Sequence, residues 1–97
     1  MNKIKILENK KNTCILCFDN LYQLQNYNST IARYDINTKK LYLNNNILNN
    51  KIIWNYSQTT LKELKNFINN YTNYNYKTFK EFKKMVEENK NIFEVKL

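Results

Sequence analysis

Two cysteines stand three positions apart, at Cys14 and Cys17, which is the spacing of half a zinc site or of a redox-active thiol pair. Zinc needs two further soft ligands, and the chain has no third cysteine and no histidine. A redox pair normally opens a helix, whereas Thr13–Phe18 is a continuous β-prone apolar run. On a strand the two thiols would point to opposite faces, roughly 10 Å apart and beyond the reach of a disulfide. We therefore expect free, packed thiols in a reducing compartment.

Three carboxylates, Glu8, Asp19 and Asp35, lie near the ends of predicted strands. A metal-dependent nuclease would gather two or three such groups around Mg²⁺. Their spacing matches no recognised catalytic motif, and the lack of histidine removes the imidazole base. We therefore expect a protein that is not an enzyme and uses no cofactor or metal, with a metal-dependent nuclease as the minor alternative.

Four lysines follow one side of a predicted helix, and they form a basic stripe that would suit the phosphates of a nucleic acid: Lys77, Lys80, Lys83 and Lys84. Apolar residues at Phe79, Phe82 and Val86 mark the opposite side of the same helix. The alternative is an ordinary solvated face, in which the carboxylates at positions 87 and 88 pair with lysines four residues earlier.

Three tyrosines, Tyr71, Tyr74 and Tyr76, connect the two predicted helices. Exposed tyrosine beside lysine can stack on unpaired bases or anchor a protein interface. The alternative is that one or two of these rings close the core between the helices. With the four lysines, the tyrosines form the partner-binding surface that the sequence predicts.

A candidate anion site lies at the start of the first predicted helix, where hydroxyl groups and a cation come together: Ser57, Thr59, Thr60 and Lys62. Helix capping explains the hydroxyl groups equally well without any ligand.

The composition narrows the classes of partner. The formal net charge is +8, and 15 of the 16 cations are lysine, with Arg33 alone as arginine. This balance favours a nucleic acid, an anionic membrane or an acidic protein, although lysine is also frequent in AT-rich genomes. Twenty asparagines and the absence of Gly, Pro and His indicate such a genome, as in a low-GC bacterium or one of its phages. No segment approaches the roughly 18 apolar residues of a membrane span, so we expect a protein of the host cytoplasm.

The elements that position these residues can be read from apolar periodicity. Leu21–Asn26 is ambiguous between a helical turn and an irregular edge, and Asn44–Lys51 reads as a loop tip. Asparagine should supply the positive-φ positions that glycine usually takes. Short strands are predicted at Lys3–Leu7, Thr13–Phe18, Ser29–Tyr34, Leu41–Leu43, Ile52–Trp54 and Ile92–Leu97.

Two helices follow the hairpins. The first has an apolar stripe from Leu61 to Tyr71 and a stop at Asn69 or Asn70. Its cap is Thr60, in a capping box with Glu63, or one turn earlier Ser57 or Thr59. The second begins at Thr78, which has the capping-box spacing with Glu81, and fades near Asn89. We therefore predict one α+β domain over residues 1–97: a small antiparallel sheet of four to six short strands with two amphipathic helices on one face.

The middle of the chain resembles a known pattern over three stretches: Tyr27–Tyr34, Lys40–Leu43 and Trp54–Ile68. The pattern is a hairpin with a (T/S)-I-A strand and a K-L-Y-L return, then a Tyr-Ser-x-Thr-Thr turn that opens a helix. It is similar to an uncharacterised family of small proteins of phages, plasmids and gut or Firmicute bacteria. Many members carry His where this chain has Glu63. The resemblance implies an origin in a mobile element and a strand–strand–helix unit, but no reaction.

Together these features predict a small accessory protein of a phage or mobile element that acts by binding. The first expectation is an anti-defence inhibitor, similar to an anti-CRISPR protein, of a host nucleic-acid-processing complex. The alternative is a direct nucleic-acid-binding protein that prefers single strands or shape over base sequence.

Overall fold

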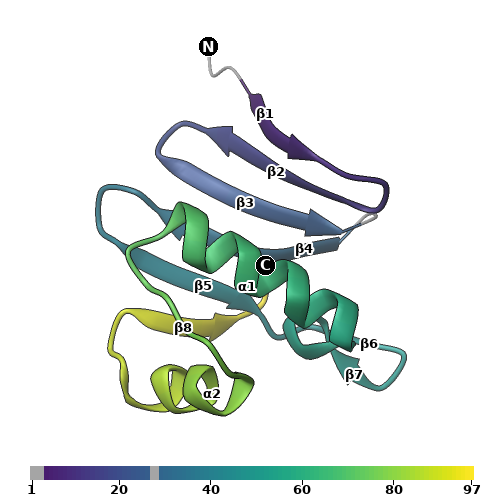
Figure 1. The fold of residues 1–97 in the computed structure, drawn as a ribbon, viewed down its shortest axis with the longest axis vertical. Helices are drawn as coiled ribbons and strands as arrows, with labels where there is room; N and C mark the ends of the chain where they lie inside the picture. The colour runs from purple at the N-terminus through teal and green to yellow at the C-terminus, as the bar shows by residue number, and fades with distance from the viewer. Residues whose placement is uncertain (1–3, 27–28) are drawn as a thin grey trace.

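The computed structural model describes residues 4–26 and 29–97, so parts of two predicted stretches, Lys3 and the pair Tyr27 and Asn28, lie outside the described residues. A six-stranded sheet has the order β1-β2-β3-β4-β5-β8 (Figure 1). Neighbouring strands run antiparallel, except that β5 and β8 pair in parallel. The strands are β1 (Lys5–Asn9), β2 (Thr13–Phe18), β3 (Leu21–Asn26), β4 (Ser29–Asp35), β5 (Lys40–Asn44) and β8 (Ile92–Val95).

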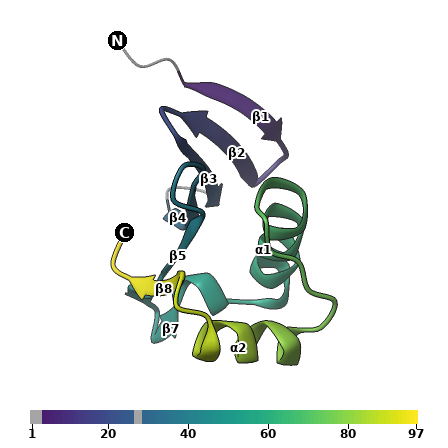
Figure 2. The ribbon, with the colours of Figure 1, turned by 90° about the vertical axis from the view of Figure 1, so that its left-hand side faces the viewer.

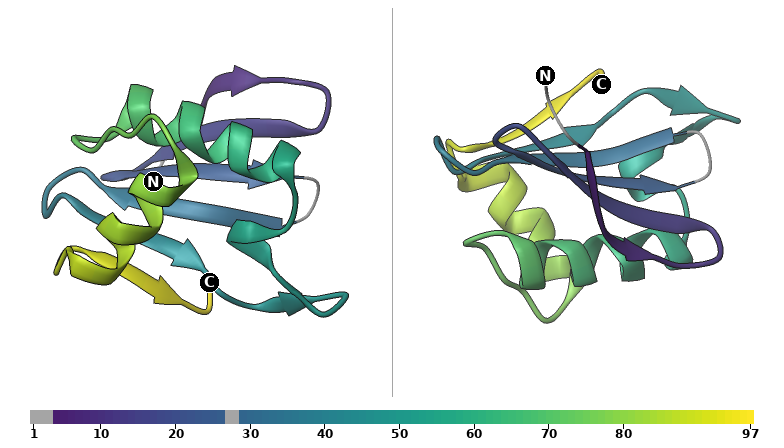
Figure 3. Two further views of the ribbon diagram at one scale, coloured as in Figure 1. Left: turned by 60° about the horizontal axis from the view of Figure 1, so that its bottom comes forward. Right: turned by 90° about the horizontal axis from the view of Figure 1, so that it is seen from above.

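Two helices, α1 (Gln58–Tyr71) and α2 (Phe79–Glu88), lie against the same face of this sheet (Figure 2). They connect β5 to β8, because a parallel pair of strands needs a long crossover. The opposite face of the sheet carries no helix of the described residues, as the view from above shows (Figure 3). The predicted α+β architecture is confirmed, with one parallel pair in the otherwise antiparallel sheet. No helix within residues 4–26 and 29–97 is both long and apolar enough to cross a membrane.

The core fills the space between the helices and the sheet. Leu64, Phe67 and Ile68 of α1 follow one another at helical spacing and are fully buried. Phe82 of α2 is also fully buried. Burying a side chain of this size stabilises the fold by roughly 1.5–3 kcal/mol. The sheet contributes Ile15, Leu24, Ala32, Tyr34, Leu41, Leu43 and Ile92.

The interpretation of Leu21–Asn26 as a helical turn or an irregular edge is wrong, because this segment is the interior strand β3. Tyr22 and Leu24 face the helices, where the ring of Tyr22 meets Tyr71 and Leu24 is 1% exposed. Gln23 points to the other face, where its side chain accepts a hydrogen bond from Arg33. The polar glutamines hide the strand signal because they lie on the face that no helix covers.

The predicted loop over Asn44–Lys51 contains a small hairpin of two strands, β6 (Ile47–Leu48) and β7 (Lys51–Ile52). Asn49 and Asn50 join them with φ angles of 52° and 64°, which suits a two-residue hairpin turn. The predicted strand Ile52–Trp54 is therefore wrong beyond its first residue. A short 3₁₀ helix, η1 (Ile53–Asn55), follows and places Trp54 in the core.

Positive φ angles occur at four of the described residues, and none is glycine, since the chain has none: Asp19, Lys39, Asn49 and Asn50. Asparagine thus fills only half of these positions. Lys39 has a φ of 59°, in a region that is unfavourable for a residue with a long side chain.

Ser57 caps α1, because its Oγ accepts a hydrogen bond from the backbone N–H of Thr60 at 3.2 Å. The helix therefore begins one turn before the capping box that Thr60 and Glu63 would form. It runs to Tyr71 and thus passes the predicted stop at positions 69–70.

Candidate functional site

The four predicted lysines are exposed along one side of α2 and just before it, and we call them the α2 lysine cluster: Lys77, Lys80, Lys83 and Lys84. The predicted cap positions them, since Thr78 Oγ1 accepts a hydrogen bond from the Glu81 N–H at 3.2 Å. Phe82 on the opposite side of α2 is buried, and this fixes the direction in which the lysines point. A fifth cation joins the cluster, because Lys65 of α1 donates from Nζ to the backbone oxygen of Lys77 at 2.7 Å.

Carboxylates at ion-pair distance do not neutralise this cluster. Among the residues that the structure describes, the ion pairs within 4 Å join Lys10 to Glu8 and to Glu63. The pairs expected between the lysines of α2 and the carboxylates at positions 87 and 88 are therefore not formed. Lys83 lies instead near the ring of Phe79, with Nζ 5.9 Å from the ring centroid.

Tyr76 does not belong to an exposed surface, which corrects the prediction that it lies at a partner-binding site. Its side chain is 4% exposed, and its ring stacks on Phe82 with centroids 4.5 Å apart. Burial raises the pKa of its hydroxyl, which is consistent with this apolar setting. Tyr76 thus closes the core between the helices, as the alternative interpretation held.

Tyr71 and Tyr74 are half-buried, and both hydroxyl groups have partners within the chain. Tyr71 donates to a carboxylate oxygen of Glu8 at 2.6 Å and packs on Phe67. The hydrogen bond to Glu8, burial and the negative charge of Glu8 raise the pKa of Tyr71 to about 12. Tyr74 donates to the backbone oxygen of Lys39 at 3.0 Å, and burial raises its pKa. These hydrogen bonds tie the helical segment to the sheet and engage the hydroxyl groups of both tyrosines.

The structure brings three of the four residues of the candidate anion site to one groove at the start of α1. Ser57, Thr59 and Thr60 line a groove of about 720 Å³ beside Leu48 and Ile53, whereas Lys62 is not among the lining residues. The Ser57 and Thr60 hydroxyl oxygens lie 3.1 Å apart, and Ser57 also caps the helix. Capping therefore accounts for two of the three hydroxyl groups.

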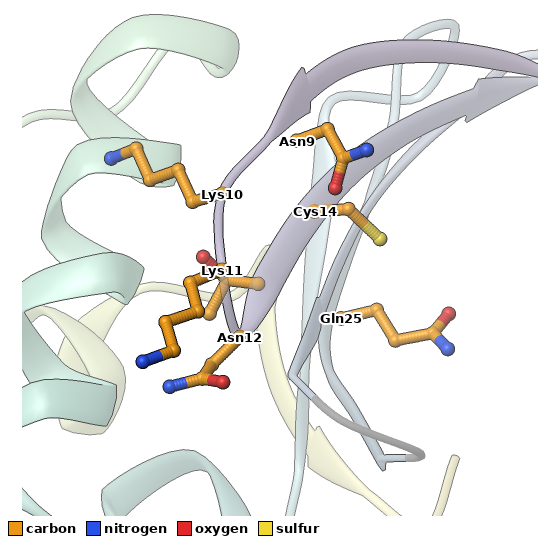
Figure 4. A pocket seen from close by; sticks show the side chains of 7 residues that line it. Asn9, Lys10, Lys11, Asn12, Cys14 and Gln25 are labelled. Atoms are coloured by element: carbon orange, nitrogen blue, oxygen red, sulfur yellow. The ribbon is translucent and has the colours of Figure 1, made fainter.

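A second, smaller cavity of about 190 Å³ lies at the turn between β1 and β2. Figure 4 shows that its side chains diverge: Lys10 and Lys11 extend toward the helices, while Cys14 and Gln25 extend away from them. Cys14 and Cys17 are both free thiols, as predicted.

The three carboxylates of the nuclease alternative have separate surroundings. Glu8 accepts hydrogen bonds from Tyr71 and Asn66 on the helix side of the sheet. Asp35 Oδ1 accepts from two backbone N–H groups of the turn that follows it. Asp19 lies in the turn between β2 and β3. Within residues 4–26 and 29–97, no three of the Cys, Asp and Glu side chains form a group that could hold a metal ion.

A second surface, not predicted from the sequence, is the sheet face that no helix covers; we call it the open face. Leu41, Leu43 and Ile92 point into the core, so the residues between or beside them point outward. Tyr42 of β5 and Phe93 of β8 are direct neighbours there, and their rings stack with centroids 5.5 Å apart at an interplanar angle of 20°. The alternation along each strand could have revealed these rings, but not that they lie side by side.

Two cations accompany this aromatic pair on the open face. Lys40 Nζ lies 5.9 Å from the centroid of the Phe93 ring. Arg33 lies directly across from Tyr42, and its Nε donates to Gln23 Oε1 at 2.7 Å. Gln23 in turn donates to Gln25 at 3.1 Å, so a chain of hydrogen bonds holds the guanidinium group in place.

The chain matches no model of a known protein family, no curated protein and no solved structure in the comparisons. The resemblance to small phage and plasmid proteins therefore stays a prediction.

Proposed function

We propose that this chain is a small accessory protein of a phage or other mobile element, that it acts by binding, and that its target is a host nucleic-acid-processing complex. An anti-defence role against a nucleoprotein such as a CRISPR effector fits this description. The α2 lysine cluster is the observation that carries the proposal, because its lysines are exposed and, among the described residues, no carboxylate oxygen lies within 4 Å of their ammonium nitrogens. The Glu81 carboxylate accepts a hydrogen bond from the backbone N–H of Lys77, at 3.2 Å.

The chemistry of the target follows from these lysines. Lysine is a flexible, hydrated point charge, so it contacts phosphate without requiring a fixed geometry. Several lysines along one helix would follow a nucleic-acid backbone and read little base sequence. Within a nucleoprotein complex, the guide or target strand supplies such a backbone. Occupying it would block substrate access without any chemical step.

The test is a cleavage assay with guide-loaded CRISPR nucleases of low-GC bacteria, a plasmid target and purified protein. We expect the native chain to protect the plasmid from at least one nuclease at near-stoichiometric amounts. The variant Lys80→Gln/Lys84→Gln should need about tenfold more protein, because two lysines no longer reach phosphates. The matched control, Lys51→Gln/Lys62→Gln, removes the same charge from outside α2 and should protect like the native chain. Equal protection by both variants would show that the α2 lysine cluster does not contribute to inhibition.

Direct nucleic-acid binding is the second candidate, and the aromatic pair on the open face specifically favours it. A direct binder would shift free, labelled oligonucleotides, with an affinity that falls steeply as salt rises. An inhibitor that requires the assembled complex would bind free oligonucleotides much more weakly than the guide-loaded nuclease.

A further inference from the structure

The open face offers a flat aromatic surface at the edge of the sheet. Tyr42 and Phe93 stand as a stacked pair on β5 and β8, and β8 is the last strand in the sheet order. No strand of the described residues pairs beyond β8, so no neighbouring strand covers the outer side of the Phe93 ring. A third flat ring could extend the stack at this side once the Lys40 side chain, whose Nζ lies 5.9 Å from the Phe93 centroid, turns toward a phosphate. Aromatic side chains on an exposed sheet are a recurrent platform for unpaired bases.

The charges near this platform favour an anion. The titratable groups on the outward side of β4, β5 and β8 are Arg33, Asp35, Lys40 and Tyr42. Asp35 is engaged by the backbone N–H groups of Asn37 and Thr38 at 2.9 and 3.1 Å. Glu94 lies on the other side, where it accepts a hydrogen bond from the Trp54 indole.

A hydrogen bond fixes the guanidinium group of Arg33, which could contact such an anion. Its Nε is fixed on Gln23, which is 6% exposed, and Arg33 makes no other hydrogen bond within the described part of the chain. The two terminal nitrogens of the guanidinium group thus make no hydrogen bond to the described residues, and Arg33 lies directly across from Tyr42 in the strand register. A planar group with fixed donors suits a phosphate better than a mobile lysine does.

We propose that the open face binds single-stranded nucleic acid: an unpaired base stacks on the outer side of Phe93, and Arg33 and Lys40 contact the adjacent phosphates. This inference rests on the second candidate function, direct nucleic-acid binding, and it uses none of the residues of the α2 lysine cluster. A net charge of +8 brings a polyanion to the protein, and the aromatic pair then selects unpaired bases over a duplex.

The experiment measures fluorescence anisotropy of a labelled oligo-dT of about 12 nucleotides, a length within the range of single-strand sites. Phe93→Leu keeps an apolar side chain but removes the flat ring, and we expect it to weaken binding about tenfold. It removes no charge, so the salt dependence should stay the same. The matched control is Tyr56→Leu, which removes a ring that also lies beside a lysine, with Lys51 Nζ 5.2 Å from its centroid, but outside the open face. It should change the affinity less than about twofold.

A second variant keeps the proposal testable if Phe93→Leu lowers the melting temperature. Arg33→Lys preserves the charge but loses the fixed guanidinium group, and it should also weaken oligo-dT binding several-fold. Native affinity in both variants would overturn the proposal. So would a dimer by sedimentation that Phe93→Leu converts to monomer, because a second copy would then cover this face.

The lysine variant Lys80→Gln/Lys84→Gln separates the two proposals. Weaker oligo-dT binding in this variant together with native binding in Phe93→Leu would overturn the open-face site and leave the α2 cluster intact. The reverse result would support the open face and count against the cluster as the route to nucleic acid.

Discussion

Replacing Tyr71 with phenylalanine removes one oxygen atom from the contact that holds the β1–β2 hairpin against α1. That oxygen donates to Glu8 at 2.6 Å, and Asn66 reaches the same carboxylate at 3.4 Å. A hydrogen bond to a charged group contributes roughly 1.5–3 kcal/mol, but water reaches this half-buried site and weakens it. We therefore expect Tyr71→Phe to lower the free energy of unfolding by about 1 kcal/mol, or the melting temperature by about 5 °C.

The pH dependence of this loss in unfolding free energy tests the hydrogen bond between Tyr71 and Glu8 more specifically. The pKa of Tyr71 rises from 10.0 in the unfolded chain to about 12 in the fold, because the neutral hydroxyl donates to Glu8 and is partly desolvated. The folded state thus holds the proton more tightly, and this stabilisation is complete below pH 10. It is lost as the pH rises from about 10 to about 12. Tyr71→Phe has no such proton to lose.

Urea unfolding of both proteins, at neutral pH and across this alkaline window, measures the effect. The difference in stability between the native chain and Tyr71→Phe should shrink as the pH rises from 10 to 12. Tyr56→Phe is the matched control, because its hydroxyl accepts a bond from the neutral amide of Asn49 at an exposed site; it should change stability by less than about 0.5 kcal/mol. A difference that stays constant with pH, or equal losses in the two variants, would refute the role given to Glu8.

Two further substitutions test the core and the backbone. Phe82→Ala should lower the free energy of unfolding by about 3–5 kcal/mol, because the ring is fully buried against Tyr76 and Trp54. Urea unfolding followed by the fluorescence emission of Trp54 measures this loss. A loss below about 1 kcal/mol would contradict the packing of this ring. Lys39→Gly should raise the stability by about 1 kcal/mol, because glycine adopts the φ of 59° without steric cost. Thr38→Gly, at a neighbouring position without a positive φ, should lower it, and a gain in both variants would show that turn strain is not the cause.

The elements with a strong local pattern could be predicted from the sequence. The apolar spacing around Leu64 and Phe67 indicated α1, and the Thr78–Glu81 spacing indicated the start of α2, because capping and amphipathicity depend only on neighbours along the chain. The sequence of β3 is ambiguous, because its polar residue Gln23 is satisfied by a hydrogen bond from Arg33 on another strand, which no local pattern contains.

In the candidate sites, too, the features that depend on neighbours along the chain could be predicted, and those that depend on contacts between elements could not. Exposure of the α2 lysines could be predicted, since the apolar side of one helix determines its opposite side. Which of the three tyrosines closes the core could not, because the burial of Tyr76 depends on the ring of Phe82 meeting it from another element. Tyr42 and Phe93 are far apart in the sequence and meet only through the parallel pairing of β5 with β8. Local periodicity carries no information about which strands pair.

We propose that this protein acts by contact between the α2 lysine cluster and the nucleic acid of a host complex. The most direct measurement is the salt dependence of binding between the labelled protein and a guide-loaded CRISPR nuclease that it inhibits. For the native chain we expect log K to fall linearly with log salt. In Lys80→Gln/Lys84→Gln the slope should become shallower by about two, roughly one for each lysine removed from a phosphate. An identical slope in the native chain and this variant would contradict the claim.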